Sequence, residues 1–233
     1  LYRELGTNLT ILRVFSGALL IIVTARLIGM EYSGGTIRIL LGRGVGRLQL
    51  LGAKLLAAFI VGFIVLVAGL ALNVVLTLIM LAAITGNLDA LHALNAGFWQ
   101  DTLIYLGTVA IGLAVPILMA ATLAVIGRSL AFGVSAGIIF FPADNFGVVF
   151  FLLAQMLTSA TGWGVATGDL LGPNLNAMPG ALLPARASAA VGFSFQTPLV
   201  PVDGGHTLLV SGLWAAAFLL IMAVLTWKRD VTQ

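Results

Sequence analysis

The chain has 233 residues, of which 61% are hydrophobic and only 8% are charged. Water-soluble domains typically carry about 25% charged residues, so this composition, with a mean hydropathy of +1.15, excludes a soluble enzyme, a coiled coil and a disordered chain. The absence of cysteine excludes disulfides, thiolate metal sites and cysteine nucleophiles. The net charge of +3 is too small to indicate nucleic-acid binding. The composition therefore predicts an integral membrane protein of the all-α class.

Five apolar segments are candidates for membrane-spanning helices, because a hydrocarbon core of about 30 Å requires about 20 helical residues. They cover residues 11–30, 50–84, 102–126, a segment that begins after Ser129, and residues 207–227. In the first segment, Arg13 and Arg26 lie near the ends, from where long side chains can reach the lipid headgroups. The second segment is longer than the hydrocarbon is thick, so its start, with Lys54, projects from the membrane or the helix tilts.

The fourth apolar segment is interrupted by Pro142, Asp144 and Asn145. We expect a broken helix there, with residues 146–157 forming a re-entrant or interfacial piece, since they are too few to span alone. Farther back, Gly133 and Gly137 form a pair of small residues at helical spacing that could bring two helices close. In a chain with 28 glycines such a pair also arises by chance.

The distribution of basic residues predicts the orientation, because cytoplasmic flanks of membrane helices collect lysine and arginine. Eight cations fall inside if the loop after the first span is cytoplasmic: Arg26, Arg38, Arg43, Arg47, Lys54, Arg128, Lys228 and Arg229. Three fall outside: Arg3, Arg13 and Arg186. Residues 158–205 then form an external loop, in which residues 162–180 have the composition of turns and Pro184 starts a short helix. We expect one transmembrane domain over residues 1–233.

The segment that joins the first two spans is basic and amphipathic. Its apolar residues Ile37, Leu40 and Leu41 recur at helical spacing, Arg38 lies on a different face, and three glycines interrupt the pattern before Arg47. This pattern predicts a short helix at the membrane surface. The alternative is a basic loop that contacts lipid headgroups.

This segment resembles one found in the membrane permeases of ATP-binding-cassette transporters of the ABC-2 exporter class. The residues that carry the resemblance are, in order, Glu31, Gly35, Thr36, Arg38, Leu40, Leu41, Arg43, Arg47 and Lys54. Many members have proline where this chain has Gly44. Weaker similarity extends to Arg128, to the Leu183–Pro184 pair and to the terminal Trp-Lys-Arg-Asp sequence.

The resemblance implies a fold of six membrane helices with short re-entrant external helices between the last two. The five visible spans then correspond to helices two to six, residues 1–10 belong to an external loop, and a preceding segment is expected because the chain opens without an initiator methionine. Residues 31–49 correspond to a cytoplasmic coupling segment that contacts an ATPase subunit. Glu31, Gly35, Thr36, Arg38, Arg43, Arg47 and Lys54 are the candidate coupling residues.

The function that the resemblance implies is a non-catalytic permease subunit of an exporter in a prokaryotic plasma membrane. Its partners are a separate ATPase subunit, a second permease copy or paralogue, and membrane lipid, with no nucleic acid. The chain itself holds no cofactor, because ATP and magnesium belong to the ATPase, and the sequence has no phosphate-binding glycine loop that ends in Lys-Ser or Lys-Thr. The substrate of such an exporter is hydrophobic or amphipathic.

Two other functions are considered. A non-transporting membrane subunit could keep this fold and scaffold a larger complex. A membrane-embedded enzyme would need ionisable groups that meet inside the bundle. Asp144 is the best-placed acid, but capping a re-entrant turn is the simpler role, and Asp89, His92 and Asp101 read as solvated or helix-capping residues in an external loop rather than as a metal site.

Overall fold

The computed structural model describes residues 2–35, 39, 42–85, 94–188 and 196–228, and every regular element within these ranges is a helix. Five helices are long and apolar enough to cross a membrane. They are α1 (Tyr2–Ser33), α3 (Arg47–Thr85), α4 (Ala96–Gly127), α5 (Leu130–Thr158) and α9 (Gly204–Lys228). The prediction of an all-α protein with five long apolar helices is confirmed.

The first and second long helices extend beyond the predicted apolar segments. Helix α1 begins at Tyr2, so residues 2–10 are helical rather than a loop. They contain no proline and only Gly6, so nothing in their sequence ends the helix before the apolar stretch. Helix α3 has 39 residues and is therefore about 58 Å long.

Helix α4 is the centre of the bundle. It packs against α1, α3, α5 and α9 and against the shorter helix α7 (Leu171–Leu182). Fully buried apolar side chains lie on two sides of it. Met119 of α4 and Met222 of α9 belong to one cluster, and Leu20 of α1 and Ala58 of α3 belong to the other. The bundle is thus organised around α4, a helix that the other helices largely cover.

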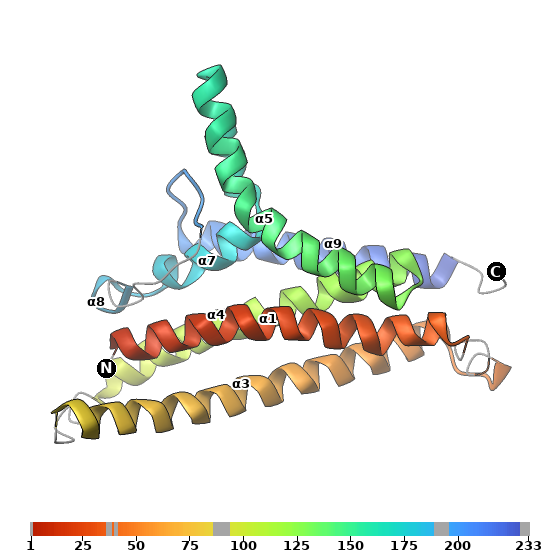
Figure 1. Cartoon of the computed structure of the whole chain (residues 1–233), viewed down its shortest axis with the longest axis horizontal. Coiled ribbons are helices and arrows are strands. Elements are labelled where there is room, and N and C mark those ends of the chain that lie inside the picture. Colours follow the sequence, from red (N-terminus) through yellow and green to blue (C-terminus); the bar gives the residue numbers. More distant parts are fainter. Residues whose placement is uncertain (1, 36–38, 40–41, 86–93, 189–195, 229–233) are drawn as a thin grey trace.

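Helix α5 does not break where a broken helix was expected. It is one continuous helix from Leu130 to Thr158 with Pro142 inside it, and it bends away from the bundle partway along its length (Figure 1). Proline removes a single backbone hydrogen bond, here the one that the carbonyl oxygen of Ile138 would accept, and Asn145 in the next turn donates from Nδ2 to the carbonyl oxygen of Phe141 at 2.7 Å. The outcome is a bent helix instead of two pieces.

Two glycines bring α5 close to its neighbours. A Cβ atom at Gly133 would lie 2.9 Å from Cβ of Ala124 in α4, and one at Gly137 would lie 2.5 Å from Cγ2 of Ile21 in α1. Both glycines are buried. The expectation that this pair lets helices approach closely is confirmed, since any side chain there would force the helices apart.

A tight turn joins α4 to α5. Arg128 has a φ of 46°, a left-handed conformation that is uncommon for residues other than glycine, and the hydroxyl of Ser129 caps α5 by accepting from the amide of Phe132. The amide of Leu130 donates to Oγ of Ser33, the last residue of α1, at 3.2 Å. The end of α1 therefore contacts the start of α5.

The segment between α5 and α9 is largely helical, although its glycines, prolines and asparagines predicted turns. It contains α6 (Gly162–Ala166), the 3-10 helix η2 (Thr167–Asp169), α7, and α8 (Ala185–Ser188), which starts directly after Pro184 as expected. Helix α7 forms because it is packed against α4, α5 and α9, and because its first proline, Pro173, lies in the first turn, where no intrahelical amide is needed.

The bundle has two distinct ends (Figure 1). At one, here called the Arg47 end, α1 and α9 finish, α3 begins and the α4–α5 turn lies. At the other, here called the α7 end, α1 and α9 begin, α3 finishes, and α7 and α8 lie (Figure 1).

Candidate functional site

An ion pair at the Arg47 end joins the two helices that flank the predicted coupling segment. Nζ of Lys54, in the second turn of α3, lies 2.5 Å from Oε1 of Glu31, near the end of α1. The two side chains are only 25% and 20% exposed. A charge-assisted hydrogen bond in such a sheltered position is stronger than a surface ion pair. It holds the start of α3 against the end of α1.

Arg47 links the same joint to the last helix. It is the first residue of α3, and its Nη1 donates to the carbonyl oxygen of Trp227, near the end of α9, at 3.5 Å. The space between the three helices is a cavity of about 30 Å³ whose lining residues are Ile28, Glu31, Tyr32, Arg47, Leu50, Leu51, Lys54 and Thr226. A cavity of this size holds about one water molecule. The described side chains at this joint therefore leave little space between the three helices.

Two glycines shape the segment between α1 and α3. Gly35, just after α1, has a φ of 66°, and Gly44 has a φ of 85°. Both values are in the left-handed region, which other residues reach only with strain. Proline cannot adopt the conformation of Gly44, because its ring fixes φ near −65°. The turn at Gly44 is therefore one that proline could not form.

The structure brings together only part of the predicted coupling set. Glu31, Arg47 and Lys54 converge on the joint described above, whereas Gly35 and Arg43 are exposed and stand apart from it. The amide of Arg43 donates to the carbonyl oxygen of Ile39 at 3.2 Å, which is one turn of helical geometry. Thr36 and Arg38 lie outside the described residues, as do Ile37, Leu40 and Leu41, the apolar residues of the predicted surface helix.

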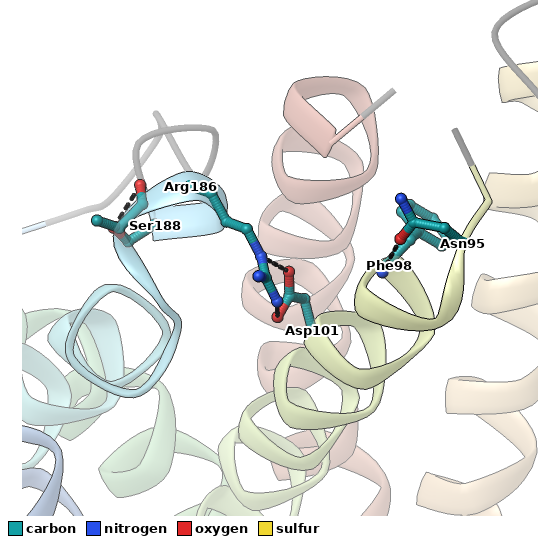
Figure 2. Close-up of polar contacts among 6 residues, drawn as sticks. Asn95, Phe98, Asp101, Arg186 and Ser188 are labelled. Atoms are coloured by element: carbon teal, nitrogen blue, oxygen red, sulfur yellow. Dashed lines mark hydrogen bonds and ion pairs between the residues drawn. The ribbon is translucent and has the colours of Figure 1, made fainter. Parts of the chain in front are cut away.

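The α7 end contains a second sheltered ion pair. Asp101, in the second turn of α4, is 2% exposed and accepts two hydrogen bonds from Arg186 of α8, at 2.9 Å to Nε and 3.0 Å to Nη2 (Figure 2). The expectation that Asp101 is solvated was wrong, because α8 folds back over the start of α4. Asn95, rather than Asp101, caps this helix, accepting from the amide of Phe98 (Figure 2). Asp89 and His92 lie outside the described residues.

Charged side chains also lie inside two of the long helices. Arg13 was expected to extend to the lipid headgroups, but it is 6% exposed and donates to two oxygen atoms of α7. Asp144, midway along α5, accepts from the amide of Gly172 in the first turn of α7. Asp144 in α5 thus caps the start of another helix, α7. Within the described ranges, no three His, Asp or Glu residues come together in a way that could hold a metal ion.

Comparison with known proteins identifies the family. The family model described as ABC-2 family transporter protein matches residues 4–144, which include nearly all of α1, the whole segment between α1 and α3, α3, α4 and half of α5. The chain belongs to the ABC-2 family. The resemblance seen in the residues between Glu31 and Lys54 is therefore confirmed. No curated protein and no solved structure matches the chain significantly.

Membership of the ABC-2 family defines the role of the chain in general terms. It is the membrane permease component of a transporter, with transmembrane helices and without catalytic activity of its own. ABC-2 permeases function with ATPase subunits and typically carry no cofactor.

Sequence reasoning missed the contributions of residues distant in the chain. The carbonyl of Trp227 and the hydroxyl of Ser33 take part in contacts at the Arg47 end. Backbone carbonyls and small hydroxyls leave no specific signal in a single sequence. The contact between Arg13 and α7 could have been anticipated from one feature only, an arginine within an apolar span, because such residues almost always face the interior of a bundle.

Proposed function

We propose that this ABC-2 permease is the membrane subunit of an ATP-driven exporter, in which residues 31–49 dock on a separate ATPase subunit at the cytoplasmic face. The Arg47 end and the C-terminus are then cytoplasmic, and the α7 end is external. In this arrangement Gly35, Thr36, Arg38 and Arg43 face the ATPase. Glu31, Arg47 and Lys54 transmit its movement to the membrane helices.

The observation that carries this proposal is the ionic joint between Glu31 and Lys54. This ion pair holds together the two helices that enter and leave the coupling segment, and its Nζ and Oε1 atoms lie 2.5 Å apart. A loop that only touches lipid headgroups requires no such clamp, whereas a segment that transmits a push must be rigidly attached to the helices it moves. The excess of cations near this end agrees with a cytoplasmic position.

The finer features of the exporter are part of the same proposal. A second copy or a paralogue completes the pore, and the substrate is hydrophobic or amphipathic, in keeping with the apolar bundle. The membrane is a prokaryotic plasma membrane. Residues 158–205 form an external segment in which α7 is re-entrant, since its 12 residues span about 18 Å, less than the hydrocarbon thickness of about 30 Å.

The test is purification of the permease from its native membrane in mild detergent, followed by identification of co-purifying chains and an ATPase assay. We expect a stoichiometric ATPase. Substituting Arg38, Arg43 and Arg47 together by alanine should lower the amount of bound ATPase at least tenfold. A double Arg26→Ala, Lys228→Ala variant, which removes cations from the same end but outside the segment, should retain the ATPase. Full retention in the triple variant would refute the proposal.

The alternative function, a non-transporting subunit that scaffolds a complex, gives a different result in the same experiment. In that case other membrane proteins would co-purify in fixed ratio and no ATPase would be present. The segment between α1 and α3 would then be an inherited surface without a partner.

A further inference from the structure

Arg13 makes an unusual contact between α1 and α7. Its side chain is 6% exposed, and it donates from Nη1 to the carbonyl oxygen of Leu175 at 2.6 Å and from Nη2 to Oδ1 of Asn176 at 2.8 Å. It reaches these atoms by passing over Gly112 of α4, where a Cβ atom would lie 2.6 Å from Cδ of Arg13. Three helices are therefore shaped around one guanidinium group.

The carbonyl that Arg13 binds is one that the helix itself leaves open. In α7, the oxygen of Leu175 would normally accept from the amide four residues later, and that residue is Pro179. Proline has no amide hydrogen, so the oxygen of Leu175 lacks its intrahelical donor. Arg13 supplies the missing donor from another helix. Pro179 and Arg13 thus act as a matched pair, since the first creates the acceptor that the second binds.

Asn176 connects this contact to two further elements. While its Oδ1 accepts from Arg13, its Nδ2 donates to Oδ1 of Asn145 in α5 at 2.7 Å and to the carbonyl oxygen of Gln196 at 2.9 Å. Asp144, next to Asn145, accepts from the amide of Gly172 at the start of α7. Two opposite charges on different spans, Arg13 and Asp144, therefore contact α7, and the asparagine side chains lie between them.

Placing these charged side chains within membrane-spanning helices costs free energy, which is typical of functional positions. Ionisable residues within spans are rare and usually mark moving or conducting parts. Helix α7 also borders a groove of about 400 Å³, whose lining is Asn176, Ala177, Gly180 and Ala181 on the α7 side and residues 197–202 on the other. The polar bonds of Asn176 thus lie at the edge of this groove, where α7 has space to move. Polar bonds can be exchanged for water when the external end opens, which apolar packing alone does not permit.

We propose that Arg13, Asn176, Asn145 and Asp144 form a polar latch that holds α7 against α1 and α5 at the external end, and that release of this latch is a step of the transport cycle. The proposal deepens the exporter function given above and rests on it for the second clause. Arg13 is a positioning residue in this scheme, because it acts through α7. The latch and the ionic joint at the Arg47 end are both attached to α1.

The test uses the absence of cysteine from the chain, which makes a single introduced thiol unique. Met178 of α7 is fully buried in the core, so a Met178→Cys reporter is shielded while α7 is held and becomes reactive to maleimide when α7 lifts. We expect slow labelling of the reporter in the purified complex. Arg13→Gln should raise the labelling rate at least tenfold, and Arg13→Lys should give an intermediate rate, since an ammonium group does not provide the two-pronged contact.

A second variant guards against a folding defect. Pro179→Ala restores the amide that competes with Arg13 for the oxygen of Leu175, while it improves the helix propensity of α7. It should also raise the labelling rate at least tenfold. Gly180→Ala is the matched control, because a Cβ atom there meets nothing within 4 Å and only the propensity changes. Its labelling rate should equal that of the parent. Parent-like rates in both Arg13→Gln and Pro179→Ala would overturn the latch.

The same preparation tests the second clause of the proposal. During hydrolysis of Mg-ATP, the reporter should be labelled at least threefold faster than without nucleotide. An unchanged rate in a preparation that hydrolyses ATP overturns latch release as a step of the cycle. If the preparation has no ATPase, the proposed exporter function fails instead, and the comparison of Arg13→Gln and Pro179→Ala with the parent still decides whether the latch exists.

Discussion

The close approach of α1 to the start of α5 makes a quantitative prediction for Gly29→Ala. A Cβ atom at Gly29 would lie 2.6 Å from Cα and 2.8 Å from N of Leu130, both backbone atoms. Ordinary contacts between carbon atoms are about 3.5–4.0 Å, so α5 must move by about 1 Å to accept one methyl group. Overpacking of this kind typically costs about 1–3 kcal/mol.

Gly52→Ala is the matched control for this prediction. Gly52 is also inside a long helix, but a Cβ atom there meets nothing within 4 Å. Both substitutions gain the same helix propensity, about 1 kcal/mol, so the difference between the two variants isolates the steric cost. Gly29→Ala should therefore be less stable than Gly52→Ala by about 1–3 kcal/mol.

The assay is unfolding of the purified permease in mixed micelles by increasing SDS, followed by the fluorescence of its four tryptophans. The free energies of unfolding of the parent and both variants are compared in the same micelles. Equal stability of Gly29→Ala and Gly52→Ala would refute the reasoning, since it would mean that α1 and α5 are not in backbone contact at this position.

Three further predictions concern the two ends of the bundle. Glu31→Gln and Lys54→Met should each lower ATP-dependent activity of the complex, and the exchange Glu31→Lys with Lys54→Glu should restore part of it; no restoration would show that the pair is not the clamp. Asp101→Asn should destabilise the permease by about 1–3 kcal/mol, measured by SDS unfolding, with Arg186→Gln giving a smaller loss because Arg186 is 60% exposed; a neutral Asp101→Asn would contradict this. Gly44→Pro should reduce the amount of ATPase that co-purifies with the permease. An unchanged amount would show that ATPase binding does not need the φ of 85° at residue 44.

The long helices could be predicted because hydrophobicity reports them directly. The predicted segment 207–227 and the helix Gly204–Lys228 differ by a few residues, and the cluster of charges and glycines after Glu31 led to the family. Helix α7 could not be predicted in this way. Its glycines, prolines and asparagines favour turns locally, and tertiary packing with a donor from α1 overrides that preference.

The remaining errors have the same cause, which is that burial depends on contacts far apart in the sequence. Arg13 and Asp101 each have a partner more than 80 positions away, in α7 and α8. Local sequence describes such a side chain only as charged, and the expectation of solvent exposure follows from that description. Pro142 shows the opposite case, since a local signal for a break was real but produced a bend.

Because α3 is long, a tilt of this helix about its close contact at Gly62 would move its two ends by different amounts. A Cβ atom at Gly62 would lie 3.0 Å from Cδ1 of Ile117, so the side chain of Ile117 in α4 packs directly on the backbone of α3 there. At 1.5 Å per residue, Arg47 lies about 22 Å from this point and Thr85 about 34 Å on the other side. A rotation of about 5° about Gly62 would displace the first by about 2 Å and the second by about 3 Å. A small tilt imposed at one face of the membrane thus arrives enlarged by half, and with opposite sign, at the other.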